Sequence, residues 1–205
     1  MKDWRNVVMG LLACALGVSL CGCGGRPKIK TLEPGAVIVA FGDSLTEGSG
    51  AGEEESYPAV LASLTGCKVI NAGVPGELSD EGRQRLPAVL RAHRPGLVIL
   101  CHGGNDLLQR VDEAAVAAHV QAMVEAAQAA GADVILLGVP KPGLFLNAPA
   151  FYAEIARRCD VPCDVKILPE ILAKGSLKSD AIHPNAAGYR KLAQRVAELI
   201  RKSQS

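Results

Sequence analysis

The stretch that decides the fold is AVIVAFGDSLTEG, residues 36–48. It begins with an apolar run rich in β-branched residues and stops abruptly at Gly42, Asp43 and Ser44. A short continuous apolar run ended by turn residues is typical of a strand buried in a parallel sheet. Ligands bind in the loops that follow such strands. Ser44 is therefore placed to act on a ligand, although Gly-Asp-Ser would also serve as a tight turn that caps a helix.

The rest of the chain alternates between strand-like and helix-like segments. Apolar runs predict further strands at residues 67–71, 97–101, 134–139 and 164–168. Helical periodicity predicts helices at residues 56–64, 77–93, 112–130, 148–158 and 185–202. This alternation implies a parallel sheet covered by helices on both faces. Right-handed crossovers would bring the loops that follow the strands to one edge of the sheet, at residues 42–47, 73–76, 103–106 and 140–143.

The composition limits the class of protein. A chain of 205 residues that is 49% hydrophobic and 21% charged is long enough for one domain plus an appendage. Its formal net charge is +1 and its Lys and Arg residues are scattered, so nucleic-acid binding is not indicated. Aromatic residues make up only 3%, so Val, Ile, Leu and Ala are expected to form the core. The cysteines lack the spacing of a metal site with a histidine cluster.

The N-terminus resembles an export signal. Lys2 and Arg5 precede an almost wholly apolar segment at 7–20, which is short for a membrane span and fits a signal-peptide core. The sequence that follows, Leu20-Cys21-Gly22-Cys23, is similar to a bacterial lipobox in which Cys23 is lipidated. We therefore expect a signal peptide at 1–22, a lipidated cysteine and polar tether at 23–34, and a folded domain at 35–205. An ordinary secretory signal and an uncleaved anchor are the alternatives.

Export would place the protein in the bacterial cell envelope, on the periplasmic side of a membrane, where the setting is oxidising. Cys159 and Cys163 have Pro162 between them and could pair in a small loop, and the sequence leaves this open. Cys67 and Cys101 lie at the ends of apolar runs and are expected to be buried thiols.

A serine nucleophile needs a base, and the base needs an orienting partner. His183 follows Asp180 by three residues, so the acid can fold back and bond Nδ1, which leaves Nε2 facing a hydroxyl. Pro184 keeps the pair in a loop before the last helix. An incidental Asp–His pair near a helix N-terminus is the alternative. His102 could line the site, whereas a surface or core position is expected for the other histidines, His93 and His119.

An oxyanion hole needs hydrogen-bond donors that are fixed before charge develops. Glycine-rich loops at the strand ends supply backbone N–H groups, and Asn105 supplies a side-chain amide. The Gly-Gly-Asn-Asp sequence at 103–106 would also suit a simple Asx turn.

Together these residues resemble the SGNH hydrolase superfamily, also called GDSL esterases, over about residues 36–200. Its four sequence blocks occur in order: Gly42-Asp43-Ser44-Leu45-Thr46, Asn71-Ala72-Gly73, Gly103-Gly104-Asn105-Asp106, and Asp180 to His183 with Pro184. The resemblance implies a flavodoxin-like three-layer α/β/α sandwich with a five-stranded parallel sheet. One departure is Pro75, where the family often has Ser or Thr before a glycine.

The resemblance also implies a mechanism without metal or cofactor. Ser44, His183 and Asp180 would form the catalytic triad, with the oxyanion hole made by the Ser44 and Gly73 N–H groups and the Asn105 amide. The residues around 42–58 look like those of the arylesterase, acyl-thioesterase and lysophospholipase branch, whose substrates are small esters, thioesters or lipids.

Two other functions stay open at this point. One is a carbohydrate O-acetylesterase that acts on envelope glycans, and the other is a non-catalytic envelope-binding lipoprotein. The loop at 141–149 contains Leu144, Phe145 and Leu146, which favours an apolar acyl groove over a polar sugar site, unless these residues only pack beneath the loop.

Overall fold

The computed structural model describes residues 27–33, 35–143 and 146–205. The predicted signal peptide and the predicted lipidation site at Cys23 lie outside the described residues, as do Leu144 and Phe145. Within the described ranges, no helix is long and apolar enough to cross a membrane.

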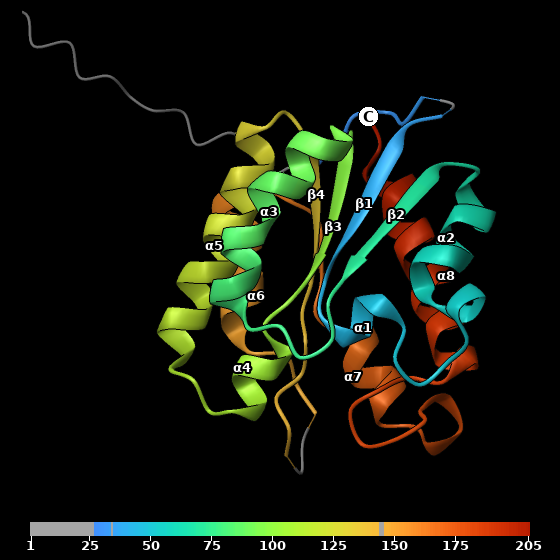
Figure 1. Cartoon of the computed structure of the whole chain (residues 1–205), viewed down its shortest axis with the longest axis vertical. Coiled ribbons are helices and arrows are strands. Elements are labelled where there is room, and N and C mark those ends of the chain that lie inside the picture. Colours follow the sequence, from blue (N-terminus) through green and yellow to red (C-terminus); the bar gives the residue numbers. More distant parts are fainter. Residues whose placement is uncertain (1–26, 34, 144–145) are drawn as a thin grey trace, which may run out of the picture.

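Five parallel strands form one sheet at the centre of the molecule (Figure 1). Their order is β2-β1-β3-β4-β5, which is the flavodoxin-like order. The strands are β1 (Val37–Gly42), β2 (Lys68–Gly73), β3 (Leu97–Cys101), β4 (Asp133–Leu137) and β5 (Cys163–Asp164). β3 is buried along its whole length, as its continuous apolar sequence requires for a strand covered on both faces.

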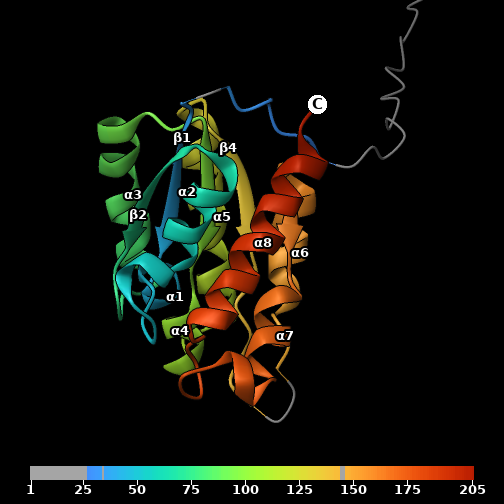
Figure 2. The same ribbon diagram turned by 90° about the vertical axis from the view of Figure 1, so that its right-hand side faces the viewer.

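Helices cover both faces of the sheet and complete the predicted three-layer sandwich (Figures 1 and 2). α2 (Tyr57–Thr65) packs with α8 (Ala186–Ser203) on one face. On the other face lie α3 (Ser79–His93), α5 (Glu113–Ala129) and α6 (Ala150–Cys159). The core between the layers is mainly aliphatic, as expected, and also contains three fully buried tyrosines: Tyr57, Tyr152 and Tyr189.

Short helical segments occupy the edge of the sheet where the strands end. These are α1 (Ser44–Glu47) after β1, α4 (Gly104–Leu108) after β3, and α7 (Ile167–Leu172) after β5. Two 3₁₀ turns, η1 (Glu53–Glu55) and η2 (Gly175–Leu177), lie in the connecting loops. In Figure 1, α1, α4 and α7 all lie below the sheet.

The predicted fifth strand at 164–168 is wrong in its extent. Only Cys163 and Asp164 pair with β4, and the chain then turns into α7. The Asp164 carboxylate causes this turn because its Oδ1 accepts the N–H groups of Lys166 (2.8 Å) and Ile167 (2.9 Å). Those two N–H groups are therefore unavailable for pairing with a neighbouring strand.

The predicted tether at 23–34 is also partly wrong, because the chain packs on the domain from Ile29 onward. Ile29 is 2% exposed, and its N–H donates to the carbonyl of Ser203 at the end of α8 (2.8 Å). The Lys30 N–H donates to Asp133 Oδ2 at the start of β4 (2.6 Å). This segment is thereby held at the edge of the sheet opposite Ser44.

Candidate active site

Ser44 lies at the end of β1, where two strands approach each other closely. A β-carbon on Gly42 would lie 2.1 Å from the carbonyl oxygen of Cys101 on β3, so only glycine fits there. Asp43 caps α1 by accepting the Leu45 N–H at Oδ1 (3.0 Å). Its burial raises the pKa of this carboxyl. The Gly-Asp pair thus sets the turn that presents the Ser44 hydroxyl.

The structure brings the three predicted triad residues together. The Ser44 hydroxyl lies 2.9 Å from His183 Nε2, and His183 Nδ1 lies 2.8 Å from Asp180 Oδ2. A carboxylate only accepts hydrogen bonds, so Nδ1 carries the proton donated to Asp180. In the neutral ring Nε2 is then the acceptor for the Ser44 hydroxyl. The geometry is that of a hydroxyl, a base and an orienting acid in one chain of hydrogen bonds.

The loop that carries His183 is fixed from both ends. Asp180 Oδ1 accepts the N–H groups of Ile182 and His183, both at 2.8 Å. Burial alone would raise the pKa of the Asp180 carboxyl, but the hydrogen bonds from the His183 ring and these N–H groups lower it. Asn185 caps α8 through the Gly188 N–H (3.1 Å), so His183 stands immediately before a rigid helix.

Asn105 lies in the first turn of α4 and lines the same cavity as Ser44 and His183. Its Nδ2 donates one hydrogen bond to the main-chain carbonyl of Glu77 (3.0 Å). A side-chain amide carries two such hydrogens, so the second remains for a ligand. Asn105 thus lies at the cavity wall with one amide hydrogen that no acceptor among the described residues takes.

Gly73 does not have a free N–H in the structure. This N–H donates to Asn71 Oδ1 (3.0 Å), and Asn71 Nδ2 in turn donates to the Glu47 carbonyl (3.0 Å). A β-carbon on Gly73 would lie 2.2 Å from Glu47 N, so the glycine lets β2 pack closely against α1. Gly73 is thus a packing position in this conformation, and its N–H is not available to an oxyanion.

A different glycine of the same loop has an unpaired N–H. The Glu77 N–H donates to the Val74 carbonyl (3.2 Å), with Pro75 and Gly76 between them. Gly76 has a φ of 80°, which suits the third position of a type II turn after a proline. Among the described residues, the Gly76 N–H makes no hydrogen bond. The Pro-Gly pair was the sequence signal for this turn.

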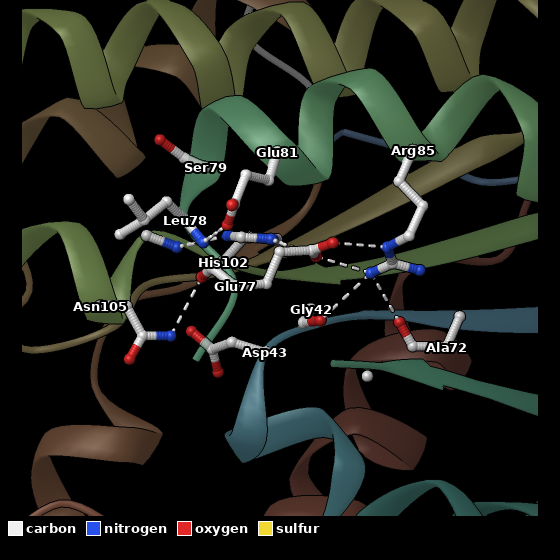
Figure 3. Close-up of polar contacts among 12 residues, drawn as sticks. Gly42, Asp43, Ala72, Glu77, Leu78, Ser79, Glu81, Arg85, His102 and Asn105 are labelled. Carbon is white, nitrogen blue, oxygen red and sulfur yellow. Dashed lines mark hydrogen bonds and ion pairs between the residues drawn. The ribbon is translucent and has the colours of Figure 1, made fainter. Parts of the chain in front are cut away.

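His102 does not line the site but lies fully buried behind it. Its Nδ1 accepts the Gly103 N–H (2.9 Å), and its Nε2 donates to Glu77 Oε2 (3.0 Å). Arg85 donates to the same carboxylate from Nε (2.6 Å) and Nη2 (2.7 Å), as Figure 3 shows. Burial alone would raise the pKa of Glu77, but these hydrogen bonds outweigh it and lower the pKa to about 2.

Each of the three tyrosines lies in a helix and hydrogen-bonds through its hydroxyl to a residue that follows β1 or β3. The Tyr57 hydroxyl shares a hydrogen bond with Thr46 Oγ1 in α1 (3.3 Å). The Tyr189 hydroxyl donates to the carbonyl of Ser49 (2.8 Å), and the Tyr152 hydroxyl donates to that of His102 (2.7 Å).

A cavity of about 310 Å³ opens beside the triad. Ser44, Asn105 and His183 line one part of it, and among the described residues that line it Lys178 alone has a lysine or arginine side chain. The rest of the wall is largely apolar and includes Leu108, Val139, Pro142, Leu146, Leu172 and Ile182. In the part of the chain that the structure describes, no group of His, Cys, Asp and Glu side chains is arranged to hold a metal ion.

None of the four described cysteines lines this cavity, although Cys101 ends β3 beside Gly42 and lies near Asp43. Across residues 27–33, 35–143 and 146–205 all four are free thiols, including Cys159 and Cys163. Burial, with the nearby Asp164 carboxylate, raises the pKa of Cys163 to about 12. Cys101 is buried as predicted, whereas Cys67 is only partly buried.

Comparison with known proteins gives one consistent family. Residues 40–191 match the GDSL-like Lipase/Acylhydrolase family. The chain is 30% identical over 156 residues to "Thioesterase 1/protease 1/lysophospholipase L1" of Escherichia coli strain K12, covering 72% of this chain and 75% of that protein. It is 27% identical over 190 residues to "Esterase TesA" of Pseudomonas aeruginosa, covering 86% of this chain and 94% of that protein.

Solved structures agree with this result. A crystal structure of TesA superposes with a TM-score of 0.73 at 26% identity, covering 81% of this chain and 98% of that chain. The structure of AlinE4, described as an SGNH-hydrolase family esterase, gives a TM-score of 0.64 at 28% identity, covering 85% of this chain and all of that one (100%).

The lowered pKa of Glu77 predicts how stability depends on pH. A carboxyl whose pKa falls on folding stabilises the protein above its ordinary pKa of 4.5 and loses that effect as the pH falls towards 2. As the pH falls through this range, the wild type should therefore lose roughly 3 kcal/mol of unfolding free energy that Glu77→Gln does not lose, at about 1.4 kcal/mol per pKa unit. The difference in stability between the two proteins should shrink by that amount. Urea denaturation at a series of pH values measures this difference. Glu54→Gln, at an exposed position in η1, is the control and should follow the wild type, whereas a constant gap for Glu77→Gln would contradict the prediction.

Proposed function

The chain belongs to the GDSL-like lipase/acylhydrolase family and is an ester-hydrolysing enzyme, and on that premise we propose that Ser44, His183 and Asp180 carry out its reaction. The observation that carries this proposal is the unbroken hydrogen-bond chain from the Ser44 hydroxyl through His183 to Asp180 at the wall of the cavity. A non-catalytic binding role is set aside because the family and its relatives are ester hydrolases.

The proposed reaction is acyl transfer to water through an acyl-enzyme. Ser44 Oγ attacks the carbonyl carbon of the ester or thioester, and its proton passes to His183 Nε2. Asp180 stabilises the resulting imidazolium through Nδ1. The tetrahedral intermediate expels the alcohol or thiol, which takes the proton from His183. Water then attacks the acyl-enzyme with His183 as base, which releases the acid and restores the Ser44 hydroxyl.

The oxyanion of each tetrahedral intermediate needs fixed donors. We assign this role to the Ser44 N–H, the second hydrogen of Asn105 Nδ2, and the Gly76 N–H in place of that of Gly73. Support for Gly76 comes from its unpaired N–H and from its neighbour Glu77, whose carbonyl is bound to Asn105. Support against Gly73 comes from the bond of its N–H to Asn71.

The proposed substrates are esters or thioesters with an apolar acyl chain. The mainly apolar wall around Leu108, Leu146 and Leu172 favours such a chain, since buried methylene groups contribute about 0.8 kcal/mol each. The names of the relatives, thioesterase, lysophospholipase and arylesterase, point in the same direction. A carbohydrate O-acetylesterase is disfavoured because this wall offers few polar partners to a sugar.

We also propose that the enzyme is a lipoprotein of the bacterial envelope, anchored through Cys23 on the periplasmic side of a membrane. Support comes from the lipobox-like sequence at 20–23. Ile29 is bound at the C-terminal end of α8, and His183 lies just before its N-terminal end. The helix has 18 residues, so its two ends are about 27 Å apart at a rise of about 1.5 Å per residue. The chain from Cys23 to Ile29 reaches about 20 Å at most. The cavity would therefore lie at the end of the domain far from the anchored cysteine.

The nucleophile can be identified by covalent labelling. A fluorophosphonate probe should label the wild type and fail to label Ser44→Ala, because the probe reacts with an activated serine hydroxyl. Gel fluorescence or intact-protein mass spectrometry measures the label. Ser49→Ala, in the same loop, is the control and should keep full labelling. Persistent labelling of Ser44→Ala would mean that another residue is the nucleophile.

The acyl preference can be measured with p-nitrophenyl acetate, butyrate and octanoate. We expect kcat/KM to rise roughly tenfold from acetate to butyrate, as two more methylene groups are buried. Leu108→Ser should flatten this rise because Leu108 lines the cavity. Leu64→Ser is the matched control, since Leu64 is also exposed (50%, against 41% for Leu108) but lies in α2 away from the cavity. A strict preference for acetate would favour the O-acetylesterase.

The anchor can be tested in the full chain expressed in a bacterial host. Metabolic labelling with an alkyne fatty acid should mark the wild type and Cys21→Ser but not Cys23→Ser. Cys23→Ser should also leave the membrane fraction. Absence of label from the wild type, or its retention by Cys23→Ser, would exclude lipidation at this position.

A further inference from the structure

We propose that Glu77 and Arg85 form a positioning unit that keeps Asn105 and Ser44 in the relative positions needed to bind the oxyanion. This inference rests on the proposed function and adds two residues that contact neither the substrate nor the triad. Both lie behind the site, where they form a polar cluster with His102 (Figure 3).

Glu77 is buried and Arg85 is partly buried, and several hydrogen bonds hold the two side chains. The Glu77 side chain is 6% exposed and that of Arg85 is 26% exposed. The carboxylate accepts two hydrogen bonds from Arg85 and one from His102, and the guanidinium stacks over Phe41 at 4.1 Å from the ring centre. Each partner is therefore held in one orientation.

Glu77 connects this cluster to Asn105. Its side chain points inward to Arg85 and His102, while its main-chain carbonyl accepts the hydrogen bond from Asn105 Nδ2 (3.0 Å). Fixing the side chain fixes the main chain of the residue, and with it the rotation of the Asn105 amide. The position of the turn at 74–77, which contains Gly76, depends on the same contact.

Arg85 connects the cluster to the nucleophile. Its Nη2 donates to the carbonyl of Ala72 on β2 (3.1 Å) and lies 3.5 Å from the carbonyl of Gly42 on β1. Gly42 is two residues before Ser44, and Ala72 is two residues before the turn at 74–77. One guanidinium thus binds the ends of both strands whose following loops carry the proposed donors.

A second buried contact fixes the other side of Asn105. The neighbouring Asp106 carboxylate accepts the N–H (2.9 Å) and the hydroxyl (2.7 Å) of Ser79 at the start of α3. α3 also carries Arg85, so α4 and the cluster are attached to the same helix. Displacement of Asn105 would require this helix to move or its carbonyl contact to break.

Stability alone does not account for the ion pair. A buried pair often stabilises no more than apolar residues of similar volume. What an apolar pair would lack is the ability to bind the carbonyls of Ala72 and Gly42 and to orient the Glu77 main chain. The arrangement is therefore better explained by geometry than by folding energy.

A double-mutant cycle tests whether Glu77 acts through Asn105. Asn105→Ala should lower kcat on p-nitrophenyl butyrate by roughly 10²–10³-fold, as expected for one oxyanion donor. Glu77→Gln places an amide N–H₂ against Arg85 or His102 and should lower kcat by roughly 10-fold or more, with KM within about twofold, because small misplacements are costly. The double variant should lose no more than Asn105→Ala alone. Additive losses, or a loss confined to KM, would overturn the proposal.

Two arginine variants control for a merely structural effect. Arg85→Lys keeps the charge but loses the planar fork whose Nε and Nη2 bind both oxygens of Glu77 while Nη2 also donates to Ala72, so it should lower kcat while keeping the fold by circular dichroism. Full kcat in Arg85→Lys would overturn the proposal even if Glu77→Gln failed to fold. Arg83→Met removes an exposed arginine of the same helix, whose one ion-pair partner among the described residues is Asp80, and should leave kcat unchanged. Activity that survives in Ser44→Ala would instead refute the proposed triad, which separates the two failures.

Discussion

The parallel pairing of β1 with β3 at Gly42 and Cys101 is the constraint on which the site depends. The order of the strands reverses here: β2 lies on one side of β1, and β3 lies on the other side. Loops that diverge from such a point leave a crevice between them. Ser44 enters it from β1 and Asn105 from β3. Their separation is set by backbone contact, since no β-carbon fits at Gly42.

The scarce aromatic residues are used at the boundary between core and site. All three tyrosines bury their rings and direct their hydroxyls to the loops that follow β1 and β3. A buried hydroxyl without a partner costs about 1–3 kcal/mol, so movement of these loops away from the tyrosines is penalised. The hydrophobic layers and the polar loops are in this way parts of one rigid unit.

Sequence reasoning succeeded where the signal was local. Apolar runs followed by turn residues predicted the sheet, and Asp180 lies one turn from His183 in the same loop. It failed where a side chain binds a main-chain N–H group that was expected to be free or paired in a strand. Asn71 accepts the Gly73 N–H, and Asp164 accepts the Lys166 N–H and ends β5 early. No sequence pattern indicated the pairing of Glu77 with Arg85, because their contacts arise only after α3 has packed against β1 and β2. Likewise, one isoleucine in a polar stretch did not reveal that Ile29 joins the core.

The contact of Ile29 with the end of α8 also brings two distant parts of the chain together. The Ser205 N–H donates to the Ile29 carbonyl (3.3 Å), so residues 29 and 205 are neighbours at the edge opposite the cavity. A short Gly-Ser linker could therefore join them, and new ends could be opened in an exposed loop such as that at 52–55. Carrier domains or solid supports attached at this edge would leave the mouth of the cavity uncovered. The domain is thus suited to circular permutation and to immobilisation in a defined orientation.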